Sequence, residues 1–218
     1  MALTAHVEEY LEAIYRLGGQ ETPVPIAALA KRLDISVVSA NEMVRRLQEQ
    51  DLVQYTPYQG VLLMQDGLCE ALAVLRRHRL WERFLTDKLG FSWDVVHEEA
   101  CRLEHAASES VTERLAEWLG DPEQCPHGHP VPQPGCVLEP ESDAVCLADL
   151  PVGQAGTVAY VASEEPELLR HLEALEIQPQ ARVEVEQVAP FEGPLTVRVN
   201  DRRQIVGHNV ALSVYVDR

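Results

Sequence analysis

The spacing of apolar residues changes once along this chain, from helical in the first half to β-type near the end. In residues 6–17 apolar side chains recur every three or four positions, whereas residues 156–162 and 181–188 are short runs rich in valine. Between these patterns, residues 120–145 are rich in Pro, Gly and Cys, which indicates a linker. The sequence therefore predicts a mainly α N-terminal part and a small, β-rich C-terminal domain.

The first 65 residues predict three helices followed by a β-hairpin. Gly18 and Gly19 end the first helix, Ser36 is a suitable N-cap for the third, and Pro57–Gly60 supplies the hairpin turn. This is the element order of a winged helix-turn-helix, which binds DNA. A protein-interaction module on the same scaffold remains the alternative. The expected elements are residues 6–17, 26–33, 37–50, 52–56 and 61–64.

The remaining chain predicts two further helical stretches and a barrel. Residues 68–89 and 94–119 have helical spacing and end at Gly90 and Gly120. The C-terminal runs, with one helix at 165–175, are typical of an SH3-like barrel; they are 156–162, 181–188, 195–199, 204–206 and 211–216. The expected domains are a winged helix-turn-helix, a helical domain, a linker and an SH3-like domain, at residues 1–66, 67–123, 124–145 and 146–218.

The formal net charge of -17 constrains how such a protein could bind DNA. Residues 1–65 hold five Lys and Arg against eight Asp and Glu, so binding must use a local basic face. Carboxylates that converge on one site repel DNA until a cation neutralises them. The charge therefore fits DNA binding that depends on a metal ion.

The cellular setting follows from two absences in the sequence. No apolar run is long enough for a membrane span, and the N-terminus has no signal-peptide pattern, so we expect a soluble, cytoplasmic protein. The five cysteines are an odd number in a mid-sized chain, unlike the framework of a small secreted domain. We expect them to be reduced.

Potential metal ligands gather on three of the expected helices. The densest group falls at i, i+4, i+7 and i+8, which is one face of a helix; it comprises His97, Cys101, Glu104 and His105. Two further pairs have one-turn spacing, namely His78 with Glu82 and Glu9 with Glu12. A lone helical His or Cys is more often a core residue, but the coincidence on three helices favours a transition-metal site. Buried together, the carboxylates would need a cation.

Four segments resemble the diphtheria toxin repressor family of iron- and manganese-dependent regulators. They are EEYLEAIYRL at 8–17, RHRLWERFL at 77–85, VHEEACRLEH at 96–105 and CPHGHPVP at 125–132. The C-terminal DLPVGQAG and EEPELLRHLEALEI are similar to the SH3-like domain of that family, so the resemblance covers essentially the whole chain. It implies a metal-dependent regulator, expected to be a repressor of metal-homeostasis genes.

The resemblance also implies two metal ions close together. The first would be held by Glu9 and Glu12 with the group on the later helix, Cys101, Glu104 and His105. The second would be held by His78, Glu82 and His97, completed from the C-terminal domain by Glu165 or Glu167. The CPHGHP segment would form a linker with a turn, although Cys125, His127 and His129 could instead bind zinc by themselves.

The metal preference is expected from two departures from the family patterns. Glu9 stands where iron-type members carry methionine, and Cys101 stands where manganese-type members carry a carboxylate. A hard oxygen favours Mn(II), whereas a thiolate suits Fe(II), Co(II) or Zn(II). We expect Mn(II), with Fe(II) as the alternative; Zn(II), Co(II), Ni(II) and Cd(II) would compete in vitro.

Metal would act by favouring a conformation in which a homodimer docks two recognition helices on a palindromic operator. Residues 68–119 would supply the dimer interface. Groove-facing residues are expected to be Ser36, Ser39 and Asn41, and phosphate contacts are expected from Lys31, Arg45 and Arg46. Glu42 could accept a hydrogen bond from a cytosine amino group or point away, and the sequence leaves both open.

Two other classes of protein compete with this interpretation. An enzyme could use Cys101 as nucleophile with His97 or His105 as base, but no Gly-rich turn or oxyanion donor set surrounds them, so we expect no enzyme. A metal-buffering protein could use its winged helix for protein interaction. DNA binding that ignores metal would favour that alternative.

Overall fold

The computed structural model describes residues 3–137 and 143–218 and divides into two compact units. The described part of the first unit covers residues 3–78, 104–107 and 132–137, and that of the second covers 79–103, 108–131 and 143–218. The described helices include none that is both long and apolar enough to span a membrane.

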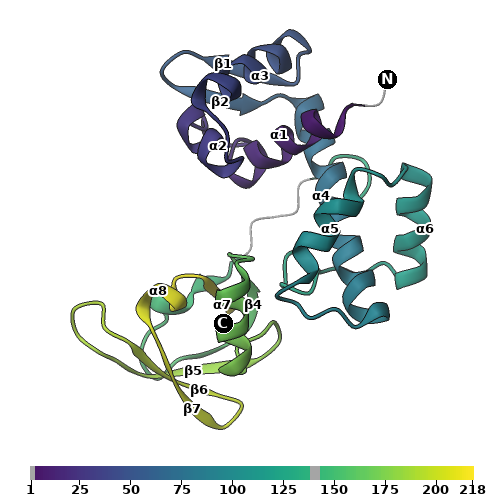
Figure 1. Cartoon of the computed structure of the whole chain (residues 1–218). Coiled ribbons are helices and arrows are strands. Elements are labelled where there is room, and N and C mark those ends of the chain that lie inside the picture. The colour runs from purple at the N-terminus through teal and green to yellow at the C-terminus, as the bar shows by residue number, and fades with distance from the viewer. Residues whose placement is uncertain (1–2, 138–142) are drawn as a thin grey trace. The chain divides into compact units, whose positions relative to one another are not determined.

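The N-terminal elements of the first unit form a winged helix-turn-helix, as the sequence predicts. Figure 1 shows three helices grouped with a hairpin: α1 (Ala5–Arg16), α2 (Ile26–Arg32), α3 (Val37–Glu49), β1 (Val53–Thr56) and β2 (Gly60–Leu63). The side chain of Thr4 caps α1, and that of Ser36 caps α3 by accepting from the Ser39 N–H. The strands pair antiparallel. Leu11 and Ile14 of α1 share one buried core with Val44 and Leu47 of α3.

The middle of the chain is helical and has one more break than expected. It contains α4 (Gln65–Leu89), α5 (Val96–Glu104) and α6 (Glu109–Leu119). The expected helix at 94–119 is interrupted after Glu104, because Ser108 caps a new helix by accepting from the Val111 N–H. Gly120 ends α6 in the left-handed conformation.

The C-terminal part of the second unit is a six-stranded antiparallel sheet in the order β3-β8-β4-β5-β6-β7. Its elements are β3 (Val145–Cys146), the short 3-10 helix η1 (Leu147–Asp149), β4 (Ala155–Val161), α7 (Pro166–Ala174), β5 (Arg182–Val188), β6 (Leu195–Val199), β7 (Arg202–Val206), α8 (His208–Ala211) and β8 (Val214–Asp217). The expected run 211–216 divides here, since Ala211 ends a helical turn and the strand starts at Val214. Alternate residues of the strands, mostly valines, fill the core with residues of α7.

In the Pro- and Gly-rich segment, residues 121–137 contain no helix and only isolated β-bridges, and part of this stretch is packed. Cys125 and His127 are buried, and the Cys125 N–H donates to the His129 carbonyl at 2.8 Å. Gly128 has φ +89°, and a Cβ there would lie 2.0 Å from the Ala159 carbonyl oxygen, so a larger residue would not fit. The tight turn fixes the side chains on either side of it. Residues 138–142 of the expected linker lie outside the described residues.

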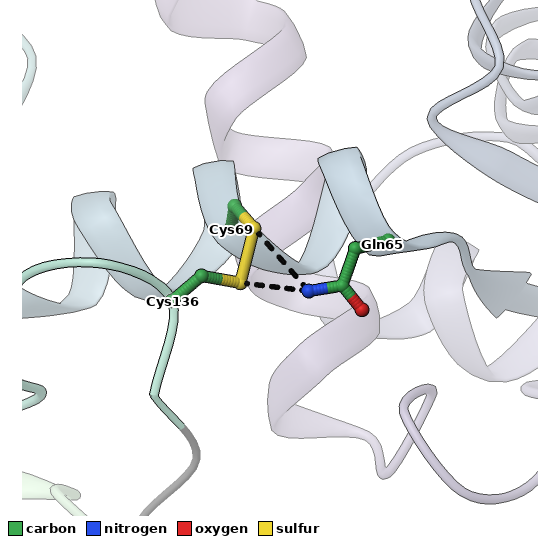
Figure 2. The surroundings of a disulfide bond; sticks show 3 residues. All are labelled: Gln65, Cys69 and Cys136. Carbon is green, nitrogen blue, oxygen red and sulfur yellow. Dashed lines mark hydrogen bonds between the residues drawn. A yellow bond between two sulfur atoms is a disulfide. The ribbon is translucent and has the colours of Figure 1, made fainter.

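Cys69 and Cys136 form a disulfide, so the expectation that all five cysteines are reduced is wrong for this pair (Figure 2). The fold brings the start of α4 against the segment that follows Pro132, and the Cα atoms of the two cysteines are 4.7 Å apart. The Arg76 guanidinium donates to the Pro132 carbonyl at 2.9 Å and the Gln65 amide donates to the Cys136 sulfur. Because 67 positions separate the two cysteines, their proximity has no local signature.

Candidate metal centres

The first unit contains a buried group of three potential ligands, which we call the first cluster: Glu12 of α1, His78 of α4 and Glu104 of α5. Their ligand atoms all lie within 4.8 Å of one another, and the residues are 8%, 0% and 3% exposed. His78 Nδ1 is 2.6 Å from a Glu104 carboxylate oxygen. Glu12 reaches this group because it lies among the buried residues of α1, which include Val7 and Leu11 of the core.

The first cluster brings two carboxylates close together. Burial raises the pKa of Glu104, the hydrogen bond from His78 opposes this rise, and the charge of Glu12 adds to it. Two carboxylates and an imidazole held this close are a donor set that a divalent cation would satisfy. The residues present therefore fit a metal ion.

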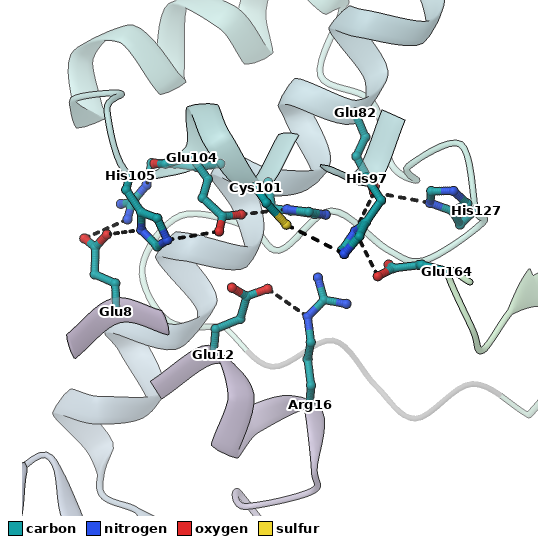
Figure 3. Close-up of polar contacts among 12 residues, drawn as sticks. Glu8, Glu12, Arg16, Glu82, His97, Cys101, Glu104, His105, His127 and Glu164 are labelled. Carbon is teal, nitrogen blue, oxygen red and sulfur yellow. Dashed lines mark hydrogen bonds and ion pairs between the residues drawn. The ribbon is translucent and has the colours of Figure 1, made fainter. Parts of the chain in front are cut away.

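His105 and Glu8 lie directly beside the first cluster. His105 Nδ1 is 2.7 Å from Glu8, and its Nε2 is 3.1 Å from Glu104 (Figure 3). Arg77 also binds Glu8, at 2.8 Å. Glu9 is not brought into this group; its side chain is 59% exposed and lies 3.7 Å from His6. The sequence held a sign of this, because Glu8 and Glu12 are one full turn apart on α1 and share a face.

The second unit contains a second buried group, which we call the second cluster: Glu82 of α4 with Cys125 and His127 of the packed loop. All three are buried and their ligand atoms lie within 4.8 Å of one another. His127 Nε2 donates to the Trp93 carbonyl at 2.7 Å, which turns Nδ1 toward Glu82 at 3.3 Å. The loop is thus oriented by backbone contacts to present an imidazole and a thiol.

The electrostatics of the second cluster reflect its burial. Burial raises the pKa of the Cys125 thiol, and the charge of Glu82 adds to the rise. Burial lowers the pKa of His127, but its hydrogen bonds to Cys125 and Glu82 and their charges outweigh this effect and raise that pKa to about 11. A metal ion would replace the protons that these groups hold.

His97 and Glu164 extend the second cluster. His97 Nδ1 lies 3.0 Å from Glu164 and 3.6 Å from Glu82, and the Cys101 sulfur lies 3.6 Å from His97 Nε2 (Figure 3). The carboxylate of the C-terminal domain that lies beside His97 is thus that of Glu164. Its neighbours Glu165 and Glu167 are exposed, because the chain enters α7 there and turns their side chains outward.

The third residue of the CPHGHP segment that was considered for zinc does not belong to the second cluster. His129 Nε2 donates to the Val161 carbonyl at 3.0 Å, and its ring lies against Tyr160. Sequence spacing could not separate His127 from His129, since both lie one residue from Gly128. The buried side of the turn decides which imidazole reaches Glu82.

The residues expected to contact DNA lie on and beside α3. Lys31, Ser36, Ser39, Arg45 and Arg46 are exposed, whereas Asn41 is half-buried. The hydroxyls of Ser36 and Ser39 are 2.8 Å apart, in addition to the capping bond. The sequence had not singled out their neighbours Val37 and Val38, which are 54% and 69% exposed on the first turn of α3. Glu42 is also exposed.

An apolar surface lies on α4 and α6 in the second unit. Phe84 contacts Trp81 and Trp118, with ring centroids 5.7 Å apart in each case. Trp118 remains 60% exposed and Leu89 57% exposed. Exposed aromatic and apolar residues of this kind are typical of a protein interface.

Three family models match the chain one after another, and together they span nearly its whole length. They are the iron dependent repressor N-terminal DNA binding domain at residues 2–61, the iron dependent repressor metal binding and dimerisation domain at 65–133, and the FeoA domain at 145–218.

Known relatives match over two thirds or more of the chain. The iron-dependent repressor IdeR of Mycobacterium tuberculosis is 34% identical over 224 residues, covering 97% of this chain and 96% of that protein. The diphtheria toxin repressor of Corynebacterium glutamicum is 40% identical over 153 residues, covering 67% and 66%. Among solved structures, a manganese-dependent transcriptional repressor in complex with manganese has a TM-score of 0.87 at 34% identity, covering 96% and 98%. ScaR with bound Zn²⁺ has a TM-score of 0.82 at 28% identity, covering 97% and 99%.

Proposed function

Because this chain belongs to the iron-dependent repressor family, we propose that it is a metal-dependent transcriptional repressor that binds operator DNA as a homodimer. Members of that family are DNA-binding repressors and not enzymes. The observation that carries the proposal is the first cluster, since it joins α1 of the winged helix to α4 and α5 through potential metal ligands.

The first cluster would hold one ion through Glu12, His78 and Glu104, with His105 beside it. The second cluster would hold another through Glu82, Cys125 and His127, with His97 and Glu164 beside it. We propose Mn(II) as the physiological metal and Fe(II) as the alternative. Two carboxylates and one imidazole in the first cluster support Mn(II), whereas the thiol of Cys125 suits a softer ion.

The metal would supply positive charge that holds α1 against α4 and α5. Because Leu11 and Ile14 of α1 share one buried core with Val44 and Leu47 of α3, a shift of α1 would be transmitted through that core to the recognition helix. Metal binding and DNA binding would then be coupled by roughly 1–3 kcal/mol. This corresponds to a change of about 5- to 150-fold in DNA affinity. Neutralising the clusters would also reduce the repulsion between an acidic protein and DNA.

The decisive test is a DNA-binding titration at fixed salt with the promoter region next to the protein's own gene. Binding is measured in chelator and then with added Mn²⁺, Fe²⁺ or Zn²⁺. We expect metal to tighten binding by about 5- to 150-fold. Equal affinity in chelator and in metal, or no binding in any condition, would contradict the proposal and favour a metal-buffering protein.

Replacing Arg45 by alanine should weaken binding to all DNA sequences about equally. Arg45 is exposed on α3, and the loss of one phosphate contact per protomer should reduce the slope of log K against log salt by about 0.9 per protomer. The measurement is a salt titration of operator and random DNA. Arg182→Ala, an exposed arginine of β5, is the matched control; an unchanged slope for Arg45→Ala would remove this residue from the interface.

Replacing Trp118 by glutamate should weaken the dimer by roughly tenfold or more, since large aromatic anchors dominate interfaces. Trp118 is 60% exposed next to Phe84. Sedimentation equilibrium of the two proteins measures the effect. Phe191→Glu changes a fully exposed aromatic residue between β5 and β6 and should leave the dimer intact. Equal dissociation constants for wild type and Trp118→Glu would place the interface elsewhere.

A further inference from the structure

We propose that Arg16 is the internal counter-ion of the first cluster and sets the metal concentration at which that cluster fills. The inference rests on the proposed metal site. In the metal-free protein the Arg16 guanidinium neutralises Glu12, and an incoming cation has to compete with it for the same carboxylate. Arg16 therefore lowers metal affinity while it stabilises the metal-free state.

The pair of Arg16 and Glu12 is short and shielded. Arg16 follows Glu12 by one turn of α1, and its Nε donates to Glu12 Oε1 at 2.7 Å (Figure 3). The two side chains are only 15% and 11% exposed. Solvent and salt screen such a pair much less than an exposed one. The charge of the guanidinium therefore acts strongly on the neighbouring groups of the cluster.

The same carboxylate belongs to the first cluster. Glu12 lies with His78 and Glu104 in the set whose ligand atoms are within 4.8 Å of one another, and the Arg16 guanidinium contacts that carboxylate directly. A divalent ion held there would stand close to the positive charge of Arg16. The neighbouring Arg77 binds Glu8 and the backbone carbonyl of Glu104.

Two roles for Arg16 predict opposite changes in metal affinity when Arg16 is removed. As a counter-ion, it repels the metal and its removal tightens metal binding. As an orienting residue, it holds Glu12 in the geometry that the metal needs, and its removal weakens metal binding. The repulsion between unit charges a few ångströms apart in a shielded site is strong, whereas α1 already fixes the Glu12 backbone beside core residues. We therefore expect that removing Arg16 tightens metal binding.

The test is Arg16→Gln in the full-length protein, with Mn²⁺ alone as the probe. Calorimetric titration should show a dissociation constant at least tenfold lower than that of wild type. Thermal unfolding in chelator should start at a lower temperature, because Glu12 loses its counter-ion, and saturating Mn²⁺ should restore the wild-type temperature. A variant that unfolds only in chelator also supports the inference, whereas one that stays unfolded in Mn²⁺ overturns it.

Two controls separate charge from shape and position. Arg16→Lys keeps the charge and should bind Mn²⁺ within about threefold of wild type; tightening equal to that of Arg16→Gln would contradict an electrostatic cause. Arg202→Gln breaks an exposed pair with Glu176 on another part of the chain and should leave Mn²⁺ affinity unchanged.

Glu12→Gln distinguishes failure of this inference from failure of the metal site. If Glu12→Gln binds as many Mn²⁺ ions as wild type and with equal affinity, the first cluster is not a metal site and the proposed function loses its support. If Glu12→Gln loses an ion but Arg16→Gln binds Mn²⁺ no more tightly than wild type, the site stands and the role of Arg16 is overturned.

Discussion

Replacing Glu104 by glutamine will lower the affinity for Mn²⁺ roughly 100-fold or more and remove the effect of metal on DNA binding. Glu104 supplies a carboxylate to the first cluster and accepts from His78 at 2.6 Å. An amide of the same shape keeps a hydrogen bond but loses the charge that would hold a cation. Even residues that only support a metal ligand contribute about 10- to 100-fold, so a ligand itself should contribute at least as much.

The stability of the metal-free variant makes this result interpretable. Burial raises the pKa of Glu104, which means that its ionised form costs folding free energy, and a neutral amide removes that cost. Glu104→Gln should therefore unfold in chelator at a temperature no lower than wild type. Glu98→Gln is the matched control on α5, because the Glu98 side chain is 69% exposed. Wild-type metal affinity in Glu104→Gln would exclude Glu104 as a ligand.

Reducing the disulfide between Cys69 and Cys136 will lower the free energy of unfolding of the unit that contains it by about 4 kcal/mol. The bridge closes a loop with a sequence separation of 67, and closing a loop of that length in the unfolded chain removes a corresponding conformational entropy. Urea unfolding of the protein with and without reductant measures the difference. An effect of this size is about a thousandfold in the folding equilibrium.

A double variant, Cys69→Ser with Cys136→Ser, supplies the control for reductant. Its unfolding should not respond to reductant, whereas Cys146→Ser should respond as wild type does. In the denatured, unreduced protein only the three cysteines outside the bridge should react with a thiol reagent. Reaction of all five cysteines would show that the bridge does not form in that preparation.

The winged helix illustrates what local pattern decides. Residues such as Leu11 and Leu47 recur at helical spacing, and Ser36 caps the helix that follows it, so helix type and approximate ends were encoded nearby. The break at Ser108 was harder to foresee, because a cap within a continuous apolar pattern competes with helix continuation. The separate helix α6 shows that the cap at Ser108 starts a new helix here and the preceding helix does not continue.

The candidate ligands divide in a similar way. The pairs at one-turn spacing, such as His78 with Glu82, could be recognised because a helix places them on one side whatever surrounds it. The sequence singled out Glu9, Glu165 and Glu167, whereas the structure places Glu8 beside His105 and Glu164 beside His97. Neighbouring acidic residues look alike in a sequence, and only the rotation of α1 and the start of α7 decide which of them turns inward.

By itself, the sequence determined the order of the winged helix-turn-helix elements, the change from α to β and the residue types that gather in the two clusters, because these depend on periodicity, capping and composition within a few residues. The tertiary structure alone decided that Cys69 meets Cys136 and that the packed loop delivers Cys125 and His127 to Glu82. These pairings join residues more than 40 positions apart, and such contacts depend on how whole elements pack. No local pattern carries that information.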